Sequence, residues 1–151
     1  DDPSMGKIIQ KCPNILLYSL SDNLIPKLNG LQKRLNLSEN QLSKLVWRHP
    51  QLFCYSMPDT MEPKLLWLQD RLCLSEKELS QFIQRYPSLL GCNVETNLSP
   101  TFAFYEECIG TEAVVALLVP DPRLFSASLE RRLKPRRIQA EQRGLKIDPG
   151  M

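Results

Sequence analysis

Apolar residues recur along this chain in blocks that follow the period of an α-helix. The first block consists of Leu24, Leu28, Leu31 and Leu35. Steps of four, three and four residues put these side chains on one face of a helix with 3.6 residues per turn. The same spacing begins again at Met61 and at Leu98, each time 37 residues further on. The pattern therefore predicts an all-α protein built from similar amphipathic helices.

A second apolar stripe follows each block after a short polar segment. The segments Ser38–Gln41 and Ser75–Glu78 have the Ser-x-x-Gln/Glu pattern of a capping box, which satisfies free N–H groups at a helix start. The third segment, Gly110–Glu112, lacks that pattern. We expect the buried face of these second helices to be Leu42, Leu45, Val46, Leu79, Phe82, Ile83, Val115, Leu118 and Val119.

Prolines divide the chain into tandem repeats. One set, Pro13, Pro50, Pro87 and Pro122, has spacings of 37, 37 and 35 residues, and a second set, Pro26, Pro63, Pro100 and Pro135, follows it by 13 residues each time. Residues 13–49 and 50–86 are identical at 17 of 37 aligned positions. We predict one helical-repeat domain over residues 1–151: a partial repeat at 1–12, repeats at 13–49, 50–86 and 87–121, and a truncated terminal repeat at 122–151.

Each repeat is predicted to contain a tight 3₁₀ turn and two helices. The turn starts at the first proline, and six residues later comes a good N-cap residue: Ser19, Ser56, Asn93 or Ser128. The second proline then lies near the start of the first helix or kinks it. A helix pair with one apolar face per helix cannot bury that face alone, so neighbouring repeats must stack. The expected fold is an all-α solenoid.

Composition excludes several classes of protein. The 151 residues are 42% hydrophobic and 24% charged, which is typical of a globular domain and excludes disorder and collagen. The longest apolar run, Ala113–Val119, is far shorter than the roughly 20 residues of a membrane span, so we expect no membrane association. No targeting segment is recognisable, and the sequence starts with Asp1 rather than Met.

Residues for catalysis or metal binding are sparse. The five cysteines include no Cys-x-x-Cys pair, and we interpret them as small buried apolar residues in a reducing compartment rather than as a bridge or a metal site. His49 is the single histidine, and no glycine-rich phosphate loop occurs. We predict a protein that is not an enzyme and that has no catalytic residues, no metal site and no cofactor.

The repeat resembles that of the mitochondrial transcription termination factor (mTERF) family. The resemblance rests on the Pro-x-Leu-Leu/Phe turns Pro50–Phe53 and Pro87–Leu90, on Ser56 followed by Met61–Leu65, and on the helix start Leu74–Leu79. It extends from Lys7 to Asp148 with the repeats in phase. It implies stacked helical repeats that bind nucleic acid in mitochondria or plastids, in transcription termination, transcription generally, ribosome assembly or splicing. The chain has fewer repeats than a full-length member, which indicates a fragment or a short member.

Basic residues recur at two positions of the repeat. Directly after the second proline come Lys27, Lys64 and Arg136, and seven residues further come Arg34, Arg71 and Arg143. Positions seven apart lie on the same flank of a helix, and cations repeated at the period of the scaffold suit the repeating phosphates of a nucleic acid. The third repeat has Thr101 and Cys108 at these positions. Solvated side chains that cover apolar surface are the alternative interpretation.

The terminal repeat carries all of the excess positive charge. Residues 1–120 have 11 basic and 13 acidic side chains, whereas residues 121–151 have 8 and 4. Its basic run consists of Arg131, Arg132, Lys134, Arg136 and Arg137. Arg137 occupies a position where the other repeats have a core residue, which predicts altered packing or a terminal cap. We interpret the run as the strongest phosphate-binding patch, with a solvated helix as the alternative.

Two functions remain open at this point. The first is a monomeric nucleic-acid-binding protein, with duplex DNA favoured over RNA, that works alongside other organellar gene-expression proteins. The second is a helical scaffold for protein partners, which the net acidity of residues 1–120 and the non-basic third repeat favour. Arg48 and Arg85, in the last turns of second helices, are expected to stabilise the helix dipole rather than to bind a ligand.

Overall fold

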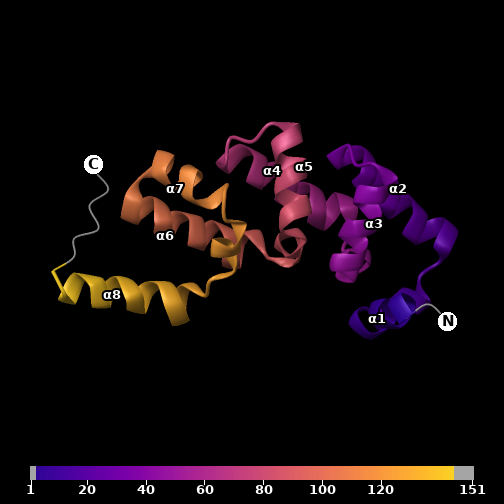
Figure 1. Ribbon diagram of the computed structural model, residues 1–151, viewed down its shortest axis with the longest axis horizontal. Coiled ribbons are helices and arrows are strands. Elements are labelled where there is room, and N and C mark those ends of the chain that lie inside the picture. Colours follow the sequence, from indigo (N-terminus) through magenta and orange to yellow (C-terminus); the bar gives the residue numbers. More distant parts are fainter. Residues whose placement is uncertain (1–2, 145–151) are drawn as a thin grey trace. The chain divides into compact units, whose positions relative to one another are not determined.

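The computed structural model describes residues 3–144, with side chains from residue 6 on, and this range contains eight α-helices and no strand (Figure 1). The α-helices are α1 (Pro3–Lys11), α2 (Ile25–Leu35), α3 (Glu39–Arg48), α4 (Glu62–Arg71), α5 (Glu76–Arg85), α6 (Ser99–Ile109), α7 (Thr111–Leu118) and α8 (Lys134–Gln142). The predicted all-α repeat fold is confirmed. The helices pack into two compact units, residues 1–70 with 74–91 and residues 71–73 with 92–151, and each unit is described by itself.

Short helical turns separate the α-helices in a fixed order. Each repeat opens with a 3₁₀ turn at its first proline: η1 (Pro13–Leu17), η3 (Pro50–Cys54), η5 (Pro87–Gly91) and η7 (Pro122–Ser126). A π-helical turn follows: η2 (Leu20–Leu24), η4 (Met57–Met61), η6 (Val94–Leu98) and η8 (Leu129–Leu133). The predicted 3₁₀ turns are therefore present in all four repeats.

The π-helical turn explains how a helix accommodates the second proline. In the first repeat the N–H of Leu24 donates to the carbonyl of Ser19 at 3.1 Å, and the N–H of Ile25 donates to Leu20, each five residues back. Pro26 has no N–H, and in an α-helix its ring would clash with the carbonyl four residues back. Widening one turn to an i→i−5 pattern avoids this conflict. The proline thus lies near the start of the helix, as the first of our two alternatives predicted, directly after the widened turn.

Side-chain caps fix the start of the first helix in all four repeats and of the second helix in the first two, whereas α7 has Gly110 as its N-cap residue and no side-chain cap. At each predicted N-cap a side-chain oxygen accepts the backbone N–H three residues on; these residues are Ser19, Ser56, Asn93 and Ser128. Ser38 with Gln41 and Ser75 with Glu78 form complete capping boxes at the starts of α3 and α5. Hydrogen bonds from Ser75 also lower the pKa of the Glu78 carboxyl. Local sequence therefore sets these helix boundaries, as predicted.

Leucine and phenylalanine from successive repeats fill the core of each unit. In the first unit, Leu65 of α4 and Leu79 and Ile83 of α5 are fully buried, and α2 packs against α3 and α5. The second unit buries Phe102 and Phe125 among other apolar side chains. Most residues of the predicted apolar stripes therefore form the core of each unit. Outside α7, the exceptions in the first and second helices are half-buried: Leu28, Leu42, Val46, Tyr105 and Ile109.

The third repeat corrects one of our predictions. Val114 is fully buried, whereas Val115 and Val119, which we expected on the buried face of α7, are half-buried. The third repeat is two residues shorter than the two before it, and the shortening lies before α7. Val114 therefore takes the position of Leu79 in the second repeat, and the buried face of α7 starts one residue earlier than predicted.

Residues with positive φ follow the first helix of each repeat. Asn36 and Cys73 have φ of 47° and 51°, Gly110 has the equivalent place in the third repeat at 80°, and Gly144 follows α8 at 73°. Cβ sterics disfavour the left-handed conformation for residues other than glycine, and asparagine tolerates it better than most. Cys73 is therefore the strained member of the set.

We expect Cys73→Gly to stabilise the protein by about 0.5–1 kcal/mol, because glycine adopts the left-handed region without a Cβ clash. Urea unfolding followed by circular dichroism measures the change. Cys73→Ala, which keeps the Cβ, is the matched control and should give no such gain. Equal stabilisation by both variants would show that the sulfur, not the backbone conformation, costs stability.

Candidate nucleic-acid interface

Two of the predicted phosphate-binding lysines connect successive repeats. The amine of Lys64 donates to the carbonyl of Leu90 at 2.6 Å, and that of Lys27 donates to the carbonyl of Phe53 at 2.7 Å. Each amine also lies over the ring of a tyrosine, 5.2 Å from the centroid of Tyr55 for Lys64 and 5.0 Å from that of Tyr18 for Lys27. Lys64 is 7% exposed and Lys27 is half-buried.

The acceptors show what these lysines do in the stack. Phe53 and Leu90 lie in the 3₁₀ turns of the following repeats, where terminal carbonyls lack helical partners. A buried ammonium needs such oxygens, and an aromatic face adds a cation–π attraction. Thr101, at the same position in the third repeat, is also buried. In the first two repeats, the lysine directly after the second proline therefore packs one repeat against the next.

Arg34 also bonds to side chains of the following repeat. Its Nε lies 2.8 Å and 3.1 Å from the two carboxylate oxygens of Glu62, and its Nη2 donates to Gln69 at 3.2 Å. The side chain is 19% exposed, so little of it faces solvent. Arg34 therefore ties α2 to α4, within the first unit.

Two cations of the terminal repeat are paired with acids. Arg137, at the position where other repeats have a core residue, is half-buried and lies 3.0 Å from both Glu107 of α6 and Glu141 of α8. It also lies 5.9 Å from the ring centroid of Phe104, and hydrogen bonds to Glu141 and Glu107 raise the pKa of its guanidinium further. Lys134 forms an ion pair with Glu130. Arg137 thus holds α8 against α6 through charge where other repeats use apolar packing.

The remaining five predicted cations are exposed. They are Arg71, Arg131, Arg132, Arg136 and Arg143. Within residues 3–144 their guanidinium groups make no hydrogen bond or ion pair with another residue. All five belong to the second unit. They are the predicted site residues that the structure leaves available to a phosphate.

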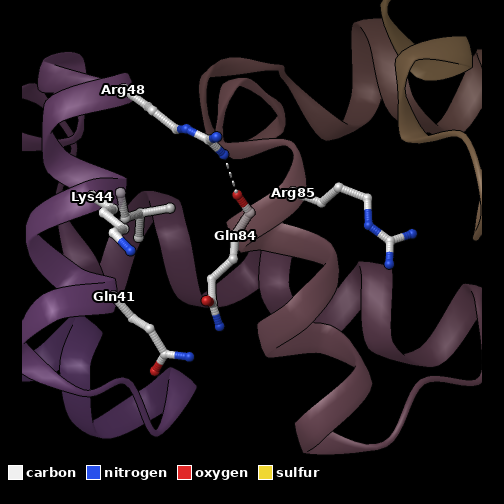
Figure 2. A pocket seen from close by; sticks show the side chains of 6 residues that line it. Gln41, Lys44, Arg48, Gln84 and Arg85 are labelled. Atoms are coloured by element: carbon white, nitrogen blue, oxygen red, sulfur yellow. Dashed lines mark hydrogen bonds between the residues drawn. The ribbon is translucent and has the colours of Figure 1, made fainter.

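A polar groove in the first unit adds residues that sequence reasoning did not assign to a site. It lies between α3 and α5, has a volume of about 390 Å³, and is lined by Gln41, Lys44, Leu45, Arg48, Gln84 and Arg85 (Figure 2). Arg48 extends from α3 towards α5 and donates to the backbone carbonyl of Gln84 at 3.4 Å. A second hollow shares Gln41 and Gln84 and adds Lys33 and Lys77 to its lining.

The recurrence of Arg48 and Arg85 at one repeat position was the signal for this groove in the sequence. A basic residue in the last turn of a helix also stabilises the helix dipole, so the repeat position by itself does not distinguish that role from ligand binding. Lys44 gave no such signal, since the next repeat has Gln81 in its place. The groove combines cations with amide side chains, a donor-rich lining that suits phosphate and sugar oxygens.

The part of the chain that the structure describes shows no arrangement for metal binding. Among these residues no three histidine, cysteine, aspartate or glutamate side chains gather closely enough to hold a metal ion. Burial and the nearby Lys11 lower the pKa of His49 and so favour its neutral imidazole. Over the same range no helix is long and apolar enough to cross a membrane.

The fold defines a class: a helical-repeat protein whose repeats open with proline turns. Within that class the chain belongs to the mTERF family, whose model matches residues 1–151, the whole sequence. A search of curated proteins finds no match. Membership of this family supports a non-enzymatic, nucleic-acid-binding role in organellar gene expression.

We expect Lys64→Met to destabilise the protein by about 1–3 kcal/mol, because it leaves the carbonyl of Leu90 buried without its donor. Lys77→Met, at an exposed position of α5, is the matched control and should change stability by less than about 0.5 kcal/mol. Urea unfolding measures both. A Lys64→Met protein that is as stable as the parent but binds nucleic acid more weakly would contradict the packing role.

Proposed function

We propose that the chain binds nucleic acid, duplex DNA in preference to RNA, and regulates or terminates transcription in a mitochondrion or plastid. The observation that carries the proposal is the division among the ten predicted cations: five are committed to packing or ion pairs, and five arginines stay exposed and unpaired within residues 3–144. Guanidinium groups of one sign gathered in one unit repel one another, and each presents a planar set of N–H donors that matches phosphate oxygens, which supports a phosphate ligand.

The ten cations have different places in the interface we propose. The primary contacts are the exposed arginines Arg71, Arg131, Arg132, Arg136 and Arg143. Two further cations, Lys134 and Arg137, support them on α8, where each keeps part of its side chain exposed beside a carboxylate. The other three hold the repeat stack together and act on binding through stability: Lys27, Arg34 and Lys64.

Electrostatics gives this interface a measurable signature. Each phosphate that a cation neutralises releases condensed counterions, so affinity falls as salt rises. Five contacts on duplex DNA would give a slope of log K against log[salt] of about −4.5, at about −0.9 per contact. Such contacts position a protein on the backbone and carry no sequence information by themselves.

The groove between α3 and α5 is proposed as a second contact surface, within the first unit. Its cations Lys44, Arg48 and Arg85 are exposed, and Gln41 and Gln84 add amide donors. Arg48 gives up little on binding, because its hydrogen bond to the carbonyl of Gln84 is long at 3.4 Å. This surface would extend the phosphate contacts beyond the terminal repeat.

Two other functions compete with duplex DNA binding. RNA binding in organellar ribosome assembly or splicing uses the same phosphate chemistry and differs in the preferred ligand. A scaffold for protein partners is the second, and the net negative charge of residues 1–120 favours it. In either case other organellar gene-expression proteins are the proposed partners, and we propose that the chain acts as a monomer.

The deciding experiment titrates the chain against labelled duplex DNA, single-stranded DNA and RNA of one sequence, with fluorescence anisotropy read at several salt concentrations. Tightest binding to duplex DNA with a steep salt slope supports the proposal. Tightest binding to RNA supports the first of the competing functions. Binding to none of the three by a folded sample at low salt supports the scaffold.

We expect Arg132→Gln/Arg136→Gln to weaken duplex binding and to reduce the magnitude of the salt slope by about 1.8, because two phosphate contacts are lost. The matched control is Lys7→Gln/Arg123→Gln, which removes the same number of charges outside both proposed contact surfaces, from the exposed Lys7 and from Arg123, which is already paired with Asp121. Equal weakening by both double variants would show that net charge, not these two contacts, drives binding.

A further inference from the structure

Two cysteines from different repeats meet within the first unit. The Sγ atoms of Cys12 and Cys54 lie 2.7 Å apart, although 42 residues separate them in the sequence. Cys12 directly follows α1, and Cys54 is the last residue of η3. Both are free thiols in this structure. A disulfide has an S–S length of about 2.05 Å, so small side-chain rotations would close the remaining gap.

These two positions lie close together because of the way in which successive repeats stack. One repeat later the equivalent positions are His49 and Gly91, 37 residues beyond Cys12 and Cys54. A Cβ placed on Gly91 would lie 3.7 Å from Nε2 of His49. The same approach therefore occurs twice in this unit. Each time, the residue just before the first proline of a repeat lies close to the last residue of the 3₁₀ turn that opens the next repeat. Cysteine occupies both positions only in the first of these two pairs.

We propose that Cys12 and Cys54 form a reversible disulfide that clamps α1 and η1 to η3. The thiols differ in access: Cys12 is 2% exposed and Cys54 is exposed. Cys54 is therefore the entry point for an oxidant, and Cys12 is the resolving thiol. This proposal replaces our interpretation of these two cysteines as inert apolar residues, and it does not depend on nucleic-acid binding.

The oxidant is a low-molecular-weight disulfide such as glutathione disulfide. The thiolate of Cys54 attacks one sulfur of the glutathione disulfide, forms a mixed disulfide and releases one glutathione thiolate. The thiolate of Cys12 then attacks Cys54 Sγ, forms the internal disulfide and releases the second glutathione. Two protein thiols are oxidised, one glutathione disulfide is reduced to two thiols, and the thiol protons pass to the released glutathione.

The surroundings make this exchange slow at neutral pH. Burial and the hydrogen bond with Cys12 raise the pKa of Cys54 to about 11, and Lys27 opposes that shift. Only the thiolate attacks, so the rate should rise about tenfold per pH unit between pH 7 and pH 9. The clamp would therefore respond to sustained oxidation rather than to brief changes.

The test incubates the full chain with glutathione disulfide, stops the reaction with acid, alkylates the remaining thiols and maps the peptides by mass spectrometry. We expect a linked peptide pair that has lost two hydrogen atoms and joins Cys12 to Cys54, whereas Cys73, which is also exposed, and the other two thiols carry an alkyl group or glutathione and form no internal disulfide. Hydrogen exchange in α1 should then slow by about tenfold or more relative to the reduced chain, because the helix can no longer separate from η3.

Three variants separate the proposed order of events from general thiol reactivity. Cys12→Ser should stop at glutathione bound to Cys54, Cys54→Ser should leave Cys12 unmodified, and Cys73→Ser should behave like the parent. A parent chain that ends with glutathione on Cys54 and a free Cys12 would overturn the proposal. So would a disulfide that joins any other two cysteines or two chains. The parent's peptide map decides the matter even if a variant fails to fold.

Discussion

A lysine amine of one repeat bonded to a turn of the next is the contact on which the first unit depends. Lys64 connects its helix to the carbonyl of Leu90 in this way, and Lys27 connects to Phe53 one repeat earlier. A 3₁₀ turn ends with carbonyls that its own chain cannot satisfy. A cation from the preceding repeat satisfies one of them and fixes the distance between repeats, so the apolar faces meet in register.

The same spacing accounts for the other contacts between repeats. Arg34 reaches Glu62, and Cys12 reaches Cys54, because each repeat places its turn beside that of its neighbour. The π-helical turns keep this geometry alike from repeat to repeat, since each absorbs a proline without bending the helix that follows. In the second unit Arg137 joins α8 to α6 by ion pairs where the other repeats use an apolar side chain.

Basic residues therefore have two roles, packing one repeat against the next and remaining free for a ligand, and the sequence alone does not distinguish these roles. Lys64 and Arg136 occupy the same position of the repeat, yet Lys64 is buried and Arg136 is exposed. The amine of Lys64 reaches a carbonyl in the next 3₁₀ turn along the chain, whereas the guanidinium of Arg136 makes no hydrogen bond or ion pair with another residue of the described range 3–144. Both residues recur at the same position of the repeat, so the sequence does not distinguish them. Whether a hydrogen-bond acceptor lies within reach in the folded protein decides which of them is free for a ligand.

The sequence by itself determined the helices, their caps, the 3₁₀ turns and the family, because each depends on residues close together in the chain or on their period. Ser75 and Glu78 form their capping box whatever surrounds them. Tertiary structure alone decided which cations are free, that α7 buries Val114, that α3 and α5 enclose a groove, and that Cys12 meets Cys54. Each of these depends on a partner from another repeat, at a distance that only the packing of helices sets.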